Sequence, residues 1–321
     1  CMEHFEAAGF MDAIKEKGFQ KKFGAVFKMD EKDCDFDFSE QFTKGWGWTW
    51  QVPRGDFDKT LADTVEIMGV PIEYETSVTD VEFNGSDSVT TVTDKNGNTK
   101  QIEAKYIIDS SGYGRVLPRL LDLDVPSNFP VRTSMFAHVK DTNRPEGLEA
   151  NRITIIAHTQ DLWVWVIPFS NGNTSIGFVG YPDEIAKFKG TAEEQFRAYV
   201  NEVKQIPERF NNAELLFEPK IITGYSAAVK QLYGNGYVLT GNSTEFLDPV
   251  FSSGVTFATE SGHIAADLVS KQLKGGKVNW EKDYKEHLMQ GVDTFRSYVY
   301  GWYDGSLQTI FFSDQVETAI K

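Results

Sequence analysis

Residues 241–254 combine residue types at a spacing that could bind an electron-rich or negatively charged ligand. The run is Gly-Asn-Ser-Thr-Glu-Phe-Leu-Asp-Pro-Val-Phe-Ser-Ser-Gly, and it follows residues 237–240, which are predicted to form a short buried strand. Apolar residues at helical spacing continue to Val269, so we expect a helix to begin near residues 252–254. The first N–H groups of such a helix have no partner inside it and favour an anion. A serine-capped helix start without a ligand is the simpler interpretation.

Residues 163–168 form a second candidate motif, Trp-Val-Trp-Val-Ile-Pro. Side chains alternate along a strand, so Trp163 and Trp165 should share one face and the two valines the other. A pair of core tryptophans would show the same alternation. The isoleucine and Pro168 complete a longer pattern that core packing alone does not require.

Together the two motifs resemble those of flavin-dependent halogenases. The pattern Phe-x-x-Pro-x-x-Ser-x-Gly, ending at Gly254, is similar to the second flavin-binding motif of FAD enzymes built like aromatic hydroxylases. The pattern Trp-x-Trp-x-Ile-Pro resembles the signature of the halogenases themselves. Phe251 stands where the tryptophan halogenases of that family have a glutamate, and phenylalanine favours the branch that acts on phenols and pyrroles.

Three weaker matches lie between and before these motifs. Arg54 begins a predicted helix whose Arg-x-x-Phe-Asp-x-x-Leu pattern resembles the family helix in which an arginine approaches the cofactor. Residues 109–112 resemble the Asp-x-Ser-Gly that closes the flavin domain. The resemblance also places backbone near Val78 beside the adenine.

The resemblance implies both a set of site residues and a reaction. It assigns Trp163, Trp165, Pro168 and Ser252 to the catalytic centre, and Ser253 and Gly254 to a halide site. It assigns FAD binding to Arg54, Val78, Asp109, Gly112, Gly241, Asn242, Asp248 and Pro249. The implied reaction uses reduced FAD from a separate flavin reductase, oxygen and chloride or bromide to halogenate an electron-rich phenol- or pyrrole-like ring, free or on an acyl or peptidyl carrier protein. Asn242 departs from the family's aspartate, and it can hydrogen-bond a hydroxyl but brings no charge.

The phosphate-gripping turn of a dinucleotide fold is not found in the sequence, because no Gly-x-Gly-x-x-Gly lies between a predicted strand and a helix. Cys1 cannot be a translation start, so we expect a preceding segment that carries this turn and the lysine that the family uses. No residue of this chain is assigned to that lysine's role. We therefore expect the chain by itself to bind FAD weakly or not at all.

The predicted fold class is α/β, or α+β, of the FAD-dependent aromatic-hydroxylase type. Residues 1–130 and 230–275 are expected to form an FAD domain with an incomplete parallel sheet, and residues 131–229 a mainly antiparallel substrate sheet. Residues 276–321 are predicted to be helical. Alternation in residues 45–52 predicts a strand with Trp46, Trp48 and Trp50 on one face, as core or as cavity wall. An acidic turn is expected around residues 30–37.

Composition limits the function classes. The chain has 321 residues and a formal charge of −15, which argues against nucleic-acid binding, and no apolar run is long enough to span a bilayer. Two cysteines give no disulfide framework and no metal cluster, so a cytoplasmic enzyme without a metal is expected. Basic residues gather only at Lys15, Lys17, Lys21, Lys22 and Lys28, as a solvated face or a dock for an acidic carrier protein.

Two other functions share the predicted fold. One is a related FAD monooxygenase or a reductase of the geranylgeranyl type, which lacks halide chemistry. The other is a flavin-binding or carrier-docking protein without catalysis, an interpretation that Asn242 and the unassigned lysine keep open.

Overall fold

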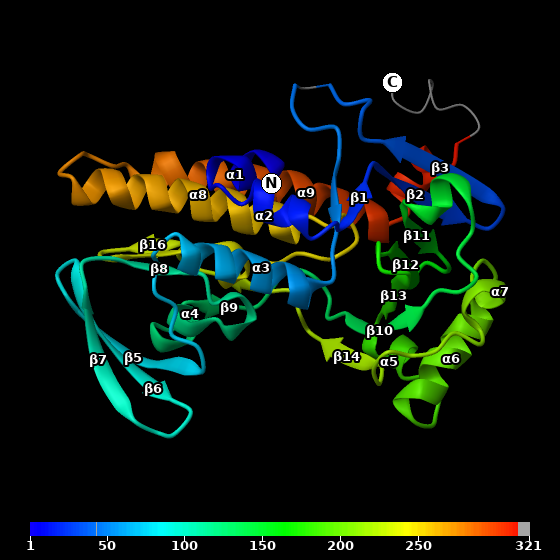
Figure 1. Cartoon of the computed structure of the whole chain (residues 1–321), viewed down its shortest axis with the longest axis horizontal. Coiled ribbons are helices and arrows are strands. Elements are labelled where there is room, and N and C mark those ends of the chain that lie inside the picture. The colour runs from blue at the N-terminus through cyan, green and yellow to red at the C-terminus, as the bar shows by residue number, and fades with distance from the viewer. Residues whose placement is uncertain (43, 314–321) are drawn as a thin grey trace.

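The computed structural model describes residues 1–42 and 44–313. It combines helices with several sheets, which confirms the predicted mixed α/β class (Figure 1). Residues 314–321, the end of the predicted C-terminal helical region, lie outside the described residues. The division into domains stays a prediction.

The largest sheet among the described residues has seven strands. Its order is β14-β10-β13-β12-β11-β2-β3, and every neighbouring pair is antiparallel except β11 and β2. The strands are β2 (Gly24–Met29), β3 (Lys32–Asp37), β10 (Thr133–Lys140), β11 (Ile153–Ala157), β12 (Leu162–Pro168), β13 (Asn173–Gly180) and β14 (Lys220–Thr223). The sheet thus takes two strands from outside residues 131–229.

The acidic segment around residues 30–37 was predicted as a turn, and this prediction was wrong for most of it. Strand β3 occupies residues 32–37. Arg152 lies buried at the start of β11 and makes ion pairs with Asp35 at 3.1 Å and Asp37 at 3.0 Å. The same guanidinium donates to the carbonyl of Phe36. Pairing with one buried cation offsets the charge that would otherwise disfavour a strand here.

Helices α5 (Pro182–Ile185), α6 (Ala192–Glu202) and α7 (Pro207–Phe210) cover one face of this sheet. A capping box begins α6, because the Thr191 side chain accepts from the backbone of Glu194 while the Glu194 carboxylate accepts from that of Thr191. Val164 and Val166 face these helices, and their side chains are at most 3% exposed.

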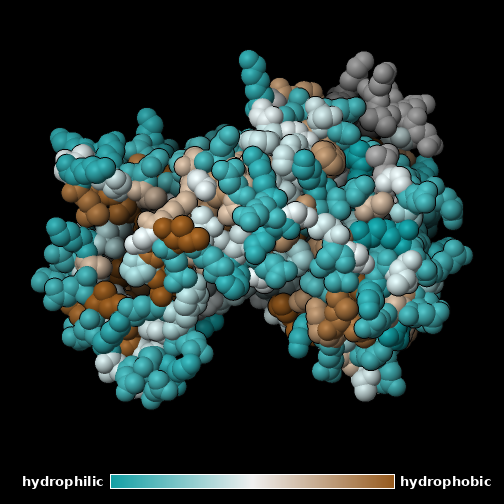
Figure 2. Space-filling view, in the orientation of Figure 1, coloured by the Kyte–Doolittle hydropathy of each residue, from teal (hydrophilic) through white to brown (hydrophobic). Residues whose placement is uncertain are grey.

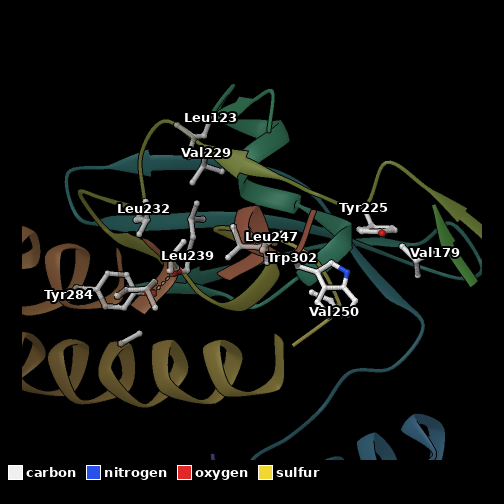
Figure 3. Packing of buried hydrophobic residues seen from close by; sticks show 14 of the residues in the cluster. Leu123, Val179, Tyr225, Val229, Leu232, Leu239, Leu247, Val250, Tyr284 and Trp302 are labelled. Atoms are coloured by element: carbon white, nitrogen blue, oxygen red, sulfur yellow. Dashed lines mark hydrogen bonds between the residues drawn. The ribbon is translucent and has the colours of Figure 1, made fainter. Parts of the chain in front are cut away.

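A three-stranded sheet contains the parallel pair β8 (Ile107–Asp109) and β17 (Tyr237–Leu239), with β16 (Tyr233–Gly234) antiparallel to β17. Helix α8 (Gly254–Leu273) begins within the predicted range. Near it, Tyr284 packs against Leu239 and donates a hydrogen bond to its carbonyl (Figure 3). This core holds the ends of β8 and β17 in place.

The remaining elements lie outside these two sheets and the helices already described. They are α1 (Met2–Ala7), α2 (Met11–Glu16), β1 (Gln20–Lys22), β4 (Thr49–Gln51), α3 (Arg54–Ile67), β5 (Thr76–Asn84), β6 (Asp87–Asp94), β7 (Thr99–Ala104), α4 (Val116–Leu120), β9 (Asp124–Val125), β15 (Ala228–Val229), α9 (His287–Tyr303) and α10 (Ser306–Phe311), with short 3₁₀ turns at Gly112–Gly114, Gly147–Ala150 and Gly241–Ser243 and a π-helical turn at Glu281–Glu286. The antiparallel sheet β5-β6-β7 extends away from the body (Figure 1).

The surface is mostly hydrophilic on the face shown in Figure 2, with hydrophobic patches between charged residues. No helix among the described residues is long and apolar enough to cross a membrane. The described part of the chain also contains no group of three or more His, Cys, Asp and Glu side chains that could hold a metal ion.

Candidate functional site

The ends of β8 and β17 bring two of the predicted flavin segments together. Backbone pairing places Leu239 beside Asp109, and the amide of Thr240 donates to the Asp109 carbonyl at 2.8 Å. Residues 241–243 and 112–114, one turn after each strand, therefore lie side by side. Ligands of α/β proteins bind beyond the carboxyl ends of parallel strands, which is where these turns lie.

Asp109 supports this arrangement from inside the protein. Its buried carboxylate accepts hydrogen bonds from the amides of Ser111 at 2.7 Å and Leu117 at 2.8 Å. Asp109 therefore orders the turn that carries Gly112, and we infer an indirect part in cofactor binding. Gly112 has φ +57°, and a Cβ there would meet nothing within 4 Å, so the backbone faces open space.

Gly241 and Asn242 differ in how they use their polar groups. The amide of Gly241 donates to Ser261 of α8 at 2.8 Å, and an added Cβ would come within 3.2 Å of Ala258, so this glycine packs the turn onto the helix. The carbonyl of Asn242 accepts from Arg115 at 2.9 Å. The half-buried Asn242 side chain forms no hydrogen bond with any residue that the structure describes, so its amide remains available to a ligand.

Asp248 connects the second motif to the tryptophan strand. Tyr303, the last residue of α9, donates its hydroxyl proton to the Asp248 carboxylate at 2.8 Å, and the same hydroxyl accepts from the Trp163 indole at 3.0 Å. Trp163 is 2% exposed and Asp248 is 3% exposed. One buried chain of hydrogen bonds thus joins the two sequence motifs through a helix that neither motif contains.

The surroundings of Asp248 raise the pKa of its carboxyl group. Burial raises the pKa of Asp248 to about 6, although the hydrogen bond from Tyr303 and the amide of Val250 oppose the rise. The Arg132 guanidinium lies between the rings of Tyr303 and Tyr181, at 4.0 and 3.6 Å from their centroids, and its charge also acts to lower the Asp248 pKa. The buried carboxylate therefore titrates closer to neutral pH than an ordinary aspartate.

Trp165 lies beside Trp163 on the predicted shared face, with ring centroids 5.9 Å apart. Its indole donates to Ser175 at 3.1 Å. Pro168 ends β12 and its carbonyl accepts from the buried Gln51 side chain at 2.6 Å. The alternation predicted for this strand is confirmed, and hydrogen bonds fix the orientation of both indoles.

The loop between Pro249 and Gly254 is backbone-strained. The amide of Ser252 donates to the Pro249 carbonyl at 3.0 Å, and Ser252 has φ +54°, in the left-handed region that costs a residue other than glycine about 1–2 kcal/mol. The exposed Ser252 side chain precedes the buried Ser253. Gly254 begins α8 beside the Phe246 ring. A Cβ atom on Gly254 would lie 3.3 Å from that ring.

The two remaining predicted flavin contacts lie apart from this cluster of hydrogen bonds. Arg54 is exposed and makes a two-point ion pair with Asp58, at 2.9 and 3.0 Å, one turn along α3. Burial raises the pKa of the nearby Tyr113 phenol to about 12, and the positive charge of Arg54 opposes this rise. Val78 is 37% exposed on β5, next to a register shift in the sheet. Neither placement tests a role in binding.

An aromatic cavity of about 770 Å³ opens beside the Val250–Ser252 loop, within the size range of small-molecule sites. Its wall includes Phe251, whose ring lies 6.2 Å from that of Trp302 and 6.1 Å from that of Tyr298. Trp302 and Val250 come together in the same core (Figure 3). The other aromatic wall residues are Phe27, Phe36, Phe38, Phe42, Trp46, Trp48, Phe295, Tyr298 and Phe311.

Trp46, Trp48 and Trp50 do not occupy a single long strand, because β4 covers only residues 49–51. Their rings instead stack edge to face, at 5.4 and 5.0 Å between successive centroids. Two of the three line the cavity. Gly45 and Gly47, on either side of Trp46, favour an irregular backbone at the start of this stretch.

Sequence reasoning missed Tyr303 as a site residue, although it lies in the aromatic C-terminal segment, and missed Arg132 and Gly177 entirely. Gly177 pairs with Trp165 across β12 and β13, and a Cβ on it would lie 2.1 Å from the indole ring. An arginine opening a buried strand is a signal for Arg132. No local signal marks Gly177, because its partner is distant in the sequence.

Comparisons with known proteins identify the family of this chain. The profile of the tryptophan halogenase family matches residues 5–320. The chain is 28% identical over 320 residues to a 1H-pyrrole-2-carbonyl peptidyl-carrier-protein chlorinase of Pseudomonas fluorescens, an alignment that covers 92% of this chain and 70% of the chlorinase. It spans just over half the length of several other curated halogenases.

Two solved structures extend the likeness to three dimensions. A flavoprotein/dehydrogenase of Cytophaga hutchinsonii is 58% identical with a TM-score of 0.95, over 97% of this chain and 77% of that one. The myxobacterial chondrochloren halogenase, an FAD-dependent enzyme, is 26% identical with a TM-score of 0.83, over 94% of this chain and 71% of that one. The fold and the family match therefore define an FAD-dependent oxidoreductase of the aromatic-hydroxylase-like class. The chain belongs to the tryptophan halogenase family, and the curated relatives that it matches include flavin-dependent halogenases.

Proposed function

We propose that the intact protein uses reduced FAD, oxygen and chloride or bromide to halogenate an electron-rich phenol- or pyrrole-like substrate. The observation that carries this proposal is the buried link from Trp163 through Tyr303 to Asp248, because it joins the two halogenase-like motifs into one unit beside an aromatic cavity. A separate flavin reductase would supply the reduced cofactor.

The residues of this chain fit one side of a flavin site. The backbone at Gly112 faces open space, the Asn242 amide is available for a hydroxyl, and Asp248 with Pro249 fixes the loop that leads to α8. When bound, FAD supplies the oxidising equivalents from oxygen. The amides of Ser253 and Gly254, at the start of a 20-residue helix, are our proposed halide contacts.

The tryptophan pair would separate the cofactor from the substrate. Hydrogen bonds fix both indoles, and Trp163 excludes water from the interior of the sheet. We propose that this wall prevents direct oxygen transfer to the aromatic ring, so that only a small halogenating species reaches it. Phe251 and the other aromatic side chains of the cavity would hold that ring by stacking.

A carrier-tethered substrate is part of the proposal, because the Pseudomonas fluorescens chlorinase is named for one. Two members of the lysine cluster, which is predicted to be a solvated face or a dock, lie in different surroundings. Lys21 is exposed over Trp48 at 4.6 Å, whereas Lys22 lines the cavity. Carrier binding should therefore be tested directly with a pyrrole-loaded carrier beside free phenols.

The test is a product assay. The intact protein is incubated with FAD, a flavin reductase, reduced nicotinamide cofactor, and chloride or bromide, together with free phenols or a carrier-bound pyrrole. Mass spectrometry should detect the halogen isotope pattern in a product, and omission of halide should abolish it. Hydroxylated product alone, or nicotinamide oxidation without product, would contradict the proposal. A flavin spectrum without turnover would favour a non-catalytic flavin-binding protein.

A second candidate function is favoured by one comparison. The Cytophaga hutchinsonii protein, at 58% identity, is described as a flavoprotein/dehydrogenase, and an FAD oxidoreductase without halide chemistry would share the fold. Such an enzyme would reduce its flavin with an organic substrate in the absence of oxygen. Anaerobic bleaching of the flavin by a substrate, with no halogenated product under air, would support this alternative.

A further inference from the structure

A second cavity, of about 330 Å³, lies on the face of the seven-stranded sheet opposite to the aromatic cavity. Alternation along β11 separates the two, because Ile153 and Ile155 line the aromatic cavity whereas Thr154 and Ile156 line this one. Its volume is at the lower end of the range of small-molecule sites. The proposed halogenation does not use it. Four residues that are at most 3% exposed form its apolar floor: Ile156, Val166, Ile206 and Phe210.

Arg209 lines this cavity with a guanidinium group that is only partly used. Its Nε and Nη2 atoms donate to the buried Asp141 carboxylate, Nε at 3.0 Å. Arg144 and Thr174 donate to the same carboxylate, so two guanidinium groups share one negative charge. Nη1 of Arg209 makes no hydrogen bond with any residue that the structure describes. The edge of the guanidinium formed by Nη1 and Nη2 can therefore bind a second carboxylate.

The second charged group of the lining has the opposite sign. Glu208 precedes Arg209 in α7, is exposed, and makes no ion pair within the described part of the chain. Lys28, the other charged residue of the lining, pairs with Asp33 at 3.4 Å. The cavity is thus lined by a guanidinium with spare positive charge and by a carboxylate that no described cation balances.

Two neutral polar groups of the lining also lack partners among the described residues. Thr154 is 8% exposed, and its hydroxyl makes no hydrogen bond with them. The Gln205 side chain donates to the carbonyl of Asp30 at 3.0 Å, but its own oxygen, Oε1, is buried without a partner. Buried polar groups normally have partners, because an unpaired one costs free energy. A ligand that offers both donors and acceptors would supply them.

The two charges decide between classes of ligand. A simple carboxylate would be attracted by Arg209 and repelled by Glu208, and a simple amine would meet the reverse. A molecule that carries both a carboxylate and an ammonium group satisfies both residues, and an apolar group on the same molecule would cover the floor.

We propose that this cavity is a second small-molecule site, and that it binds an α-amino acid with an apolar side chain. The ligand's carboxylate pairs with the free edge of Arg209, and its ammonium group donates to Glu208 and to Oε1 of Gln205. Its side chain packs on the apolar floor. The sheet separates this site from the aromatic cavity, so the ligand does not compete with an aromatic substrate, and the inference does not depend on the proposed halogenation.

The test measures binding alone, without FAD, halide or reductase. The probes are leucine, 4-methylpentanoate, which lacks the ammonium group, and 3-methylbutylamine, which lacks the carboxylate. Isothermal titration calorimetry at neutral pH should show leucine bound about tenfold more tightly than either of the others. That factor is at the lower end of what a hydrogen bond to a charged group contributes.

Matched variants locate the binding site. Glu208→Gln should remove the preference for leucine over 4-methylpentanoate, whereas Glu218→Gln, on an exposed glutamate outside the lining, should behave as wild type. Thr154→Val should weaken leucine binding about two- to tenfold without loss of stability, because the hydroxyl has no partner in the protein to lose. Arg209→Lys keeps a donor for Asp141 but has no second edge, so it should weaken leucine and 4-methylpentanoate alike. Thermal melting confirms that each variant is folded.

Three results would overturn the inference. Leucine does not bind to the wild type, or 4-methylpentanoate or 3-methylbutylamine binds as tightly as leucine, or leucine binding is unchanged in all three cavity variants, which would place it elsewhere. The outcome of the halogenation assay has no bearing on any of them, because the binding test contains none of the reactants.

Discussion

The Trp165 indole lies directly across Gly177 of the neighbouring strand, in the space that any side chain at Gly177 would occupy. An ideal Cβ there would come within 2.1 Å of the indole ring, and the two residues are backbone partners in the β12–β13 ladder. Trp165 therefore keeps its orientation for two reasons: residue 177 has no side chain, and the indole donates a hydrogen bond to Ser175.

Gly177→Ala should displace the Trp165 ring and lower the free energy of unfolding by about 1–3 kcal/mol, as overpacking in a core does. Gly262→Ala is the matched control, because a Cβ at Gly262 in α8 meets nothing within 4 Å. Alanine in a helix interior should raise stability by about 0.5–1 kcal/mol. Urea unfolding followed by tryptophan fluorescence measures both, and equal effects would show that Gly177 is not a packing site.

Tyr303→Phe should remove one hydroxyl that serves two buried groups. The Trp163 indole loses its acceptor and the Asp248 carboxylate loses a donor, so we expect a loss of about 1–3 kcal/mol of stability. Tyr300→Phe, on the same helix but 44% exposed, should change stability little. In the product assay, Tyr303→Phe should also lower the ratio of halogenated product to oxidised nicotinamide. An unchanged ratio would show that the link only stabilises the fold.

Asp248 should make the protein less stable as pH rises. Its folded pKa of about 6 lies above its ordinary value of 3.8, so the folded protein binds the proton more tightly than the unfolded chain does. The resulting stabilisation is complete only below about pH 4 and is lost as pH rises towards 6. Asp248→Asn lacks this dependence, so its stability relative to wild type should rise across that interval by an amount on the order of 3 kcal/mol. Unfolding at several pH values measures the difference, and a flat difference would contradict the raised pKa.

Ser252→Gly should relieve the left-handed backbone and raise stability by up to about 1 kcal/mol. If the hydroxyl or the strained loop acts in catalysis, halogenation should fall at the same time. Asp122→Gly is the control, because Asp122 has φ +53° and a fully exposed side chain away from the site. It should gain stability and keep activity. Full activity in Ser252→Gly would remove Ser252 from the proposed catalytic centre.

Local periodicity predicted much of the fold. The alternation in residues 163–166, the start of α8 and the strands of the large sheet follow from patterns of apolar residues, which local sequence contains. The strand β3 was missed because its acidic residues favour a turn, and only the distant Arg152 makes them acceptable in a sheet. Trp46–Trp50 was predicted as one strand because alternation alone cannot show that the rings stack on each other.

The site was predictable where it depends on short motifs and not where it depends on distant partners. The motifs placed Asp248 and Trp163 in the site, but Tyr303 lies 55 residues after Asp248 and 140 after Trp163, and nothing in its local sequence marks it. Lys22 looked like one of five solvated lysines. Its place in an aromatic cavity follows from β1 pairing with β4, which no short pattern shows.

The parallel pairing of β2 with β11 affects how the polypeptide can be divided. Ile153 lies beside Ala25, so strands from near the start of this chain complete a sheet whose other members come more than a hundred residues later. If residues 131–229 were produced as a separate fragment, β11 would lose its partner β2 and become an exposed hydrophobic edge strand, which is a site for aggregation. During synthesis, the hairpin of β2 and β3 is made more than a hundred residues before its partner β11. Residues 24–37 therefore stay without that pairing for longest, and this is where we expect a chaperone to be needed.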